Sequence, residues 1–251
     1  MKGASDRDSG KTGAAPTPAG VRFQRYAQTM TWASEQARQE VALPPGYRAQ
    51  LRCGGQFSLW DGLLPRWLRW MRAASPAVAL HTEVGQPDGL MRQLGEGLLD
   101  IGVMYTPQSR PGLVVEQPSE ERLVLVSTRR DSTAPMEDGY VYVDWGPEFQ
   151  TAHGMRYPDL PMPGLYVGLG ALALSYIRQS GGAGYFPLRV VRPYLDRGEL
   201  FPVPGTASFA RPAHVVYPTA RDDELLATAV EGLRLLAAQE TEDATKPART
   251  D

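Results

Sequence analysis

From residue 48 to residue 105 the sequence alternates between short apolar runs and longer amphipathic stretches, and this order constrains the fold. The runs at 48–55, 77–84 and 99–105 are predicted strands. Each stretch between these runs has apolar residues at helical spacing. In the first stretch they are Leu59, Trp60, Leu63, Leu64, Trp67, Leu68 and Met71. A strand–helix–strand–helix–strand order predicts a parallel sheet with right-handed crossovers.

A further series of strands and helices is predicted from residue 112 onwards. Short strands are predicted at 112–117, 122–128, 140–146, 164–170, 182–187, 199–205 and 212–218, and helices at 171–179, 188–197 and 221–239. Two small α/β units in one chain predict a two-lobed clamp, in which a small ligand binds between the lobes. We assign residues 46–119 and 219–239 to lobe I, and residues 120–218 to lobe II.

The segment before the first strand is predicted to be one long helix at residues 17–43. Thr17 can cap it, Pro18 suits its first turn, and no further proline occurs before Pro44. One stripe steps by four and three residues, at Phe23, Ala27, Met30, Ser34, Ala37 and Val41. The stripe could pack on its own domain, but heptad-like spacing over the full length favours pairing with a second helix. Residues 1–16 and 240–251 lack large periodic apolar residues and are predicted to be disordered.

Composition excludes several classes of protein. The formal net charge of −2 does not recruit nucleic acid or an anionic membrane. Cys53 is the single cysteine, so no internal disulfide can form. No apolar stretch approaches the roughly 20 residues that span a bilayer, and the first residues do not resemble a signal peptide. A soluble cytoplasmic protein is expected.

No catalytic or metal-binding constellation is expected. His81, His153 and His214 are scattered, and no Cys/His pair has metal-ligand spacing. Cys53 lies among apolar neighbours and is predicted to be a buried, unreactive thiol. We therefore expect no catalytic residue, metal or cofactor.

Candidate ligand-binding residues follow the ends of predicted strands. The carboxyl ends of parallel strands are where α/β clefts open, and a helix N-terminus offers free N–H groups there. Ser58 is predicted to cap the first helix and could also contact a ligand, whereas Trp145 and Phe149 could face the ligand or the core. Helices beginning after Ser58 and Gly170 would favour a small organic anion. The candidate binding residues are Gln56, Ser58, Thr106, Trp145, Phe149, Gly168 and Gly170.

Several stretches together resemble the LysR-type transcriptional regulators. TPAGVRFQRYAQTM and EQARQEVALP resemble the end of the wing and the linker helix of that family. Residues 54–104, which include LDIG, resemble its first regulatory lobe, and LVLVST and GGAGYFP resemble parts of the second. VDWGPEFQ resembles a segment of the HdfR-like branch. The resemblance implies a type II periplasmic-binding-protein-like effector domain preceded by a linker helix, which dimerises through Phe23, Ala27, Met30, Ala37 and Val41.

The resemblance does not extend to the DNA-reading head of the family. Members begin with a winged helix-turn-helix, whereas 16 residues precede Thr17 here and contain no recognition helix. The expected partners are therefore a second copy in a dimer or tetramer, a small-molecule effector and full-length relatives, with DNA contacted only if an intact head is supplied. A stand-alone small-molecule-binding protein and an enzyme on the same scaffold are the alternatives.

Overall fold

The computed structural model describes residues 43–135, 139–219 and 223–245, together with single positions between residues 17 and 37. The described positions from residue 20 to residue 37 are helical, and the side chains of Phe23, Tyr26 and Met30 are exposed. Val41 lies outside the described residues. In the part of the chain that the structure describes, no helix is both long and apolar enough to cross a membrane.

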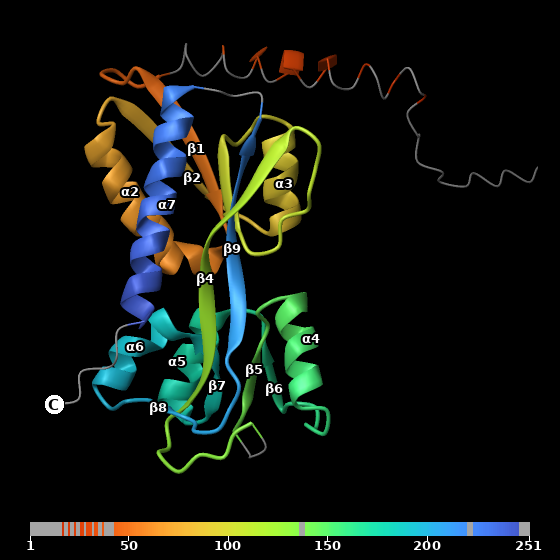
Figure 1. Ribbon diagram of the computed structural model, residues 1–251, viewed down its shortest axis with the longest axis vertical. Helices are drawn as coiled ribbons and strands as arrows, with labels where there is room; N and C mark the ends of the chain where they lie inside the picture. Colours follow the sequence, from red (N-terminus) through yellow and green to blue (C-terminus); the bar gives the residue numbers. More distant parts are fainter. Residues whose placement is uncertain are drawn as a thin grey trace, which may run out of the picture.

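Lobe I is built on the predicted parallel strands. β1 (Ala49–Gly55) pairs in parallel with β2 (Val78–Val84) on one side and with β3 (Ile101–Met104) on the other. α2 (Leu63–Ala74) connects β1 to β2, and α3 (Pro87–Gly95) connects β2 to β3 (Figure 1). The parallel βαβαβ prediction is confirmed.

An ion pair ties two of these strands together inside lobe I. The Asp100 carboxylate accepts hydrogen bonds from the Arg52 backbone N at 2.7 Å, from its Nε at 3.2 Å and from its Nη2 at 2.8 Å. Both residues are buried. The pair therefore joins β1 to the start of β3 with charge-assisted bonds.

Two long antiparallel strands run through both lobes (Figure 1). β4 (Leu113–Ser127) and β9 (Phe209–Pro218) pair with each other over most of their length. The sequence predicted two separate strands where β4 is continuous. Its register shifts between Glu116 and Ser119, around Pro118, which lacks an N–H and is accommodated at a bulge.

The strands of lobe II lie in segments that were predicted to be strands. β5 (Val141–Val143) and β6 (Leu165–Val167) pair in parallel. β7 (Ala183–Pro187) and β8 (Phe201–Pro202) pair antiparallel with β4. The second lobe is therefore joined to the first by hydrogen-bonded strands as well as by the chain.

Three helices cover lobe II. α5 (Gly170–Ser180) and α6 (Leu188–Asp196) match predicted helices. α4 (Pro147–Arg156) was not predicted. Its buried side chains, Phe149 and His153, are one turn apart, and this is too short a pattern to identify a helix from periodicity.

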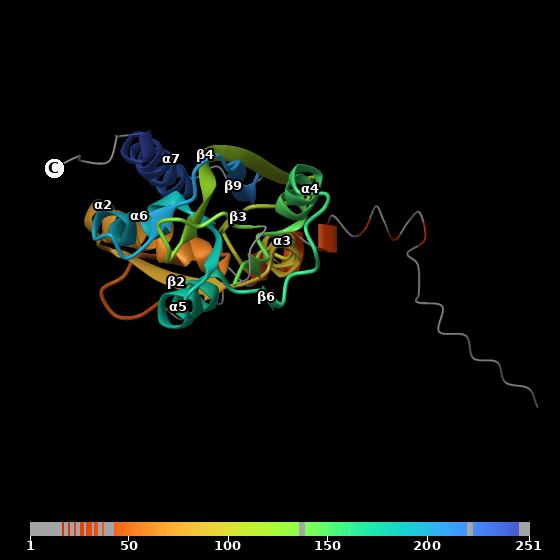
Figure 2. The ribbon, with the colours of Figure 1, turned by 90° about the horizontal axis from the view of Figure 1, so that it is seen from below.

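The core is divided between the lobes. The lobe I cluster includes residues of β1, α2 and β3 together with Ala213 and Val215 of β9. α7 (Glu224–Thr245) packs on α2, where Trp67 Nε1 donates to the Ala229 carbonyl at 2.9 Å, and it continues past the predicted end at residue 239. Figure 2 shows α2, α6 and α7 on one side of the long strands and α3 and α4 on the other.

Candidate functional site

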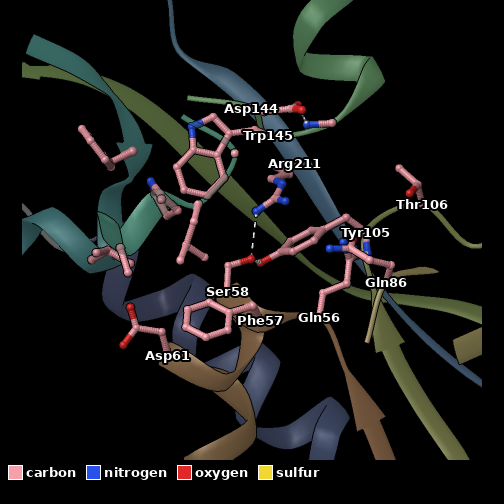
Figure 3. A pocket seen from close by; sticks show the side chains of 18 residues that line it. Gln56, Phe57, Ser58, Asp61, Gln86, Tyr105, Thr106, Asp144, Trp145 and Arg211 are labelled. Carbon is pink, nitrogen blue, oxygen red and sulfur yellow. Dashed lines mark hydrogen bonds between the residues drawn. The ribbon is translucent and has the colours of Figure 1, made fainter. Parts of the chain in front are cut away.

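A cavity of about 240 Å³ lies between the two lobes (Figure 3). Its lining residues follow β1 and β3 in lobe I and β5 and β6 in lobe II, and others come from β7, α6 and the crossing strand β9. Six of the seven sequence-predicted binding residues line it: Gln56, Ser58, Thr106, Trp145, Gly168 and Gly170.

Gln56 and Ser58 form the lobe I wall with Tyr105. The Gln56 side-chain carbonyl accepts from the Tyr105 backbone N at 2.7 Å, and the Ser58 hydroxyl donates to the Tyr105 hydroxyl at 3.2 Å. Tyr105 was not among the predicted residues. It follows β3 directly, next to the predicted Thr106, so its position after a parallel strand was the available signal.

Ser58 does not cap an α-helix, and that prediction is wrong. It lies inside a short 3-10 helix (Phe57–Asp61), whereas α2 begins after Gly62. A helix running on from Ser58 would put Pro65 in its interior, where proline has no N–H to donate to the Asp61 carbonyl, whereas in α2 Pro65 lies in the first turn. The carbonyls of Ser58 and Asp61 accept from Arg189 instead, at 2.7 and 3.0 Å.

Trp145 and Gly170 form the lobe II wall. The Trp145 indole Nε1 donates to the Tyr185 carbonyl at 2.8 Å, which holds the ring in place. A Cβ on Gly170 would lie 2.2 Å from the ring, so glycine permits this contact between α5 and Trp145. α5 begins at Gly170, one residue before the predicted start at Ala171, and its first residues line the cavity. The N-terminus of a helix carries a partial positive charge that favours an anion.

Phe149 lies away from the cavity, among aromatic residues in the lobe II core. It packs against Tyr142, His153, Tyr185 and Phe209, with ring centroids 5.2–5.8 Å away. Of the two readings left open for this residue, the structure favours the core. Trp145 belongs to both environments, because it is buried in the lobe II core and also lines the cavity.

Arg211 on β9 is the cation that sequence reasoning missed. Its Nη1 donates to the Ser58 hydroxyl at 3.2 Å and lies 3.8 Å from Glu121. Its guanidinium carbon lies 3.4 Å from the centroid of the Tyr105 ring and 4.9 Å from that of Trp145. Burial lowers the pKa of this guanidinium. The available signal was a charged side chain inside the mostly apolar strand FARPAHVVYP.

Glu121 and Arg189 form a second charged group beside the cavity. Arg189 Nε donates to Glu121 at 2.6 Å, and the Tyr105 hydroxyl donates to the other carboxylate oxygen at 2.9 Å. Burial opposes the charge on Arg189, but the Glu121 carboxylate outweighs it and raises the pKa of that guanidinium. The group links the lobes, because Tyr105 of lobe I donates to Glu121 and Arg189 of α6 donates to the lobe I carbonyls of Ser58 and Asp61.

Two other titratable groups, Cys53 and His153, are buried and do not line the cavity. Cys53 is buried in β1, and burial raises the pKa of its thiol. Burial lowers the pKa of His153 to about 4, and its Nε2 lies 2.8 Å from the Tyr140 hydroxyl. Within the described residues, no group of three or more His, Cys, Asp or Glu could hold a metal ion.

Comparisons with known proteins identify relatives. The family model described as the LysR substrate binding domain matches residues 45–235. The HTH-type transcriptional regulator HdfR of Salmonella schwarzengrund is 25% identical over 204 residues, which cover 80% of this chain and 72% of the relative.

Solved structures share the fold. Full-length LysG from Corynebacterium glutamicum with bound effector Arg has a TM-score of 0.65 and 16% identity, and the match covers 89% of this chain and 79% of LysG. The BenM effector binding domain with its effector benzoate has a TM-score of 0.58 and 20% identity, and the match covers 80% of this chain and 96% of the BenM domain.

Proposed function

This chain belongs to the LysR substrate binding domain family, and from that premise we propose that it senses a small organic anion held between its two lobes. It contains the effector-binding region of a LysR-type transcriptional regulator. The proposed role of the cleft is recognition rather than catalysis.

The carrying observation is that one cavity is lined from both lobes and contains the guanidinium of Arg211 together with the N-terminus of α5. Ser58 and Gln56 come from lobe I, and Trp145 and the N-terminus of α5 come from lobe II. Arg211 adds a guanidinium from the crossing strand. A ligand that contacts both walls would change the balance of contacts between the lobes, and this is how such a clamp can report binding.

Two neighbours support a ligand that carries a carboxylate. LysG is described with the effector Arg and BenM with the effector benzoate, and each of these effectors carries a carboxylate. The Trp145 and Phe57 rings in the cavity wall suit a ligand with a carbon body better than an inorganic ion.

Two glycine variants provide the test. Gly168 lines the cavity and a Cβ there meets no atom within 4 Å, so Gly168→Leu should place a side chain in the cleft without disturbing the fold. Gly164 has equally open surroundings but does not line the cavity, so Gly164→Leu is the matched control. The measurement is the rise in Tm of each variant across a panel of small organic acids.

An acid that stabilises the wild type should stabilise Gly164→Leu equally and Gly168→Leu far less. Equal stabilisation of all three proteins would place the binding site outside this cleft and overturn the proposal.

We also propose that the chain self-associates through the stripe of Phe23, Ala27, Met30, Ala37 and Val41. Exposure of Phe23 and Met30 supports this, because large apolar side chains on a regular stripe are typically covered by a partner. Contact with DNA is proposed only for a protein in which this region is joined to a DNA-reading head.

A further inference from the structure

The guanidinium of Arg211 is incompletely paired for a group so deeply buried. The residue is 9% exposed, yet its Nη1 makes its one hydrogen bond to a described residue, the Ser58 hydroxyl. Its Nε is buried and has no partner among the described residues. Because a guanidinium has five N–H donors and buried donors are normally satisfied, Arg211 retains unused capacity to bind an acceptor.

The charge of Arg211 is also poorly compensated. Glu121 is 3.8 Å away, but it already accepts from Arg189 at 2.6 Å and from the Tyr105 hydroxyl. Arg52 provides an internal comparison, since its buried guanidinium is matched by its own carboxylate. A negatively charged group on a ligand would give Arg211 the carboxylate partner that Asp100 gives Arg52.

Aromatic rings restrict how a ligand can approach Arg211. The guanidinium lies beside Tyr105 from lobe I and Trp145 from lobe II, with its carbon 3.4 and 4.9 Å from the ring centroids (Figure 3). Cation–π contacts of this kind occupy the faces of the group and leave its edge for hydrogen bonding. An edge of two parallel N–H donors matches a planar carboxylate.

The other charges in the wall limit the ligand to one carboxylate. Asp61 and Asp144 both line the cavity, whereas Arg211 is its only lining cation among the described residues. The Asp144 oxygens already accept from the Gly146 N–H and the Tyr166 hydroxyl. In about 240 Å³, a second carboxylate on the ligand would meet these aspartates without a cation of its own.

We propose that Arg211 is the residue that binds the effector, and that the effector is a small monocarboxylate rather than a dicarboxylate. This assignment rests on the proposed function of the cleft and deepens it. The carboxylate accepts from the N–H groups that Ser58 does not use, and the remainder of the ligand lies against the Trp145 ring.

The test compares matched compounds on the full chain. Butyrate and benzoate are the monocarboxylate probes, succinate and terephthalate the dicarboxylates, and butyramide and benzamide the uncharged analogues. Binding is measured by titration calorimetry and by the rise in Tm. The variants are Arg211→Gln, Arg211→Lys and, as a control on an exposed arginine, Arg197→Gln.

At least one monocarboxylate should bind the wild type, and its dicarboxylate and amide partners should bind much more weakly. Arg211→Gln should weaken that binding at least about tenfold, because a buried charge loses its partner. Arg211→Lys should recover part of the affinity, since it restores the charge without the planar edge. Arg197→Gln should bind like the wild type. Circular dichroism of the unliganded variants establishes that they are folded.

The contrary outcomes separate the two proposals. If a monocarboxylate binds Arg211→Gln as tightly as the wild type but fails to bind Gly168→Leu, the Arg211 assignment is wrong while the cleft remains the site. If the dicarboxylates or amides bind best and Gly168→Leu abolishes their binding, the monocarboxylate assignment is wrong. If no probe binds the wild type, or if the probes bind Gly168→Leu as tightly as the wild type, both the inference and the proposed function fail.

Discussion

Replacing Gly170 with alanine is expected to destabilise the chain through a single new contact in the cavity wall. The added Cβ would lie 2.2 Å from Trp145 Cη2 and 3.0 Å from two further ring atoms. The ring cannot easily give way, because its Nε1 is bonded to the Tyr185 carbonyl and its face packs near Arg211 and Phe186. The start of α5 or the indole must therefore shift by more than 1 Å to restore a normal separation, which is on the order of 3.4–4 Å.

The expected cost combines two opposing effects. Overpacking a well-filled site costs about 1–3 kcal/mol. The higher helix propensity of alanine stabilises a helix by up to about 1 kcal/mol relative to glycine. The net loss of unfolding free energy is therefore up to about 2 kcal/mol, which lowers the Tm of a chain of this size by up to about 8 °C.

The assay is thermal unfolding of Gly170→Ala beside Gly168→Ala. Gly168 lines the same cavity, but a Cβ there meets no atom within 4 Å, so its variant should change Tm little. Because Trp145 would be pushed within the cleft, Gly170→Ala should also alter the affinity for any ligand that the wild type binds. If the two alanine variants have the same Tm, the contact between Gly170 and Trp145 does not constrain this wall, and the reasoning is refuted.

Three further outcomes are expected. Asp100→Ala should lower the unfolding free energy by about 3–5 kcal/mol, because it leaves the buried Arg52 guanidinium without its carboxylate, and a loss below about 1 kcal/mol in urea unfolding would contradict this. Burial lowers the pKa of His153 from 6.5 to about 4, so the unfolded chain takes up a proton first as the pH falls. Stability should therefore drop progressively from pH 6.5 towards pH 4, by up to about 3 kcal/mol, and His153→Gln should remove that part of the drop. Replacing both Met30 and Ala37 with Glu should shift the chain towards monomer in sedimentation, because charges would oppose each other across an apolar seam, and unchanged sedimentation would exclude this stripe as the interface.

Local sequence pattern was sufficient to identify most secondary structure and the edge at which the cleft opens. Alternating strands and helices imply a parallel sheet, and the carboxyl ends of its strands must meet at one edge. Gln56, Ser58 and Thr106 were selected for that reason, and all three line the cavity. Their role as ligand contacts remains a proposal.

The local sequence pattern was insufficient where the conformation or position of a residue depends on a partner distant in the sequence. The two predicted strands around Pro118 merge into β4 because β9 pairs alongside both of them. The carbonyls of Ser58 and Asp61 accept from Arg189, which comes from the other lobe and could not be read from the local pattern. Phe149 was a candidate for the cavity wall, but its position on α4 directs its side chain towards His153 and Phe209 in the lobe II core.

The sequence by itself determined the class of fold, the two lobes and the order of the elements, since these follow from hydrophobic period and strand–helix alternation, which are local properties. The tertiary structure decided the chemistry of the cleft. Arg211 is distant in sequence from Tyr105, Trp145 and Ser58, and it meets them only after β9 has paired with β4 between the lobes. Its burial, its stacking and its unused donors arise from that convergence, because they depend on which side chains surround the guanidinium in space and not on its neighbours along the chain.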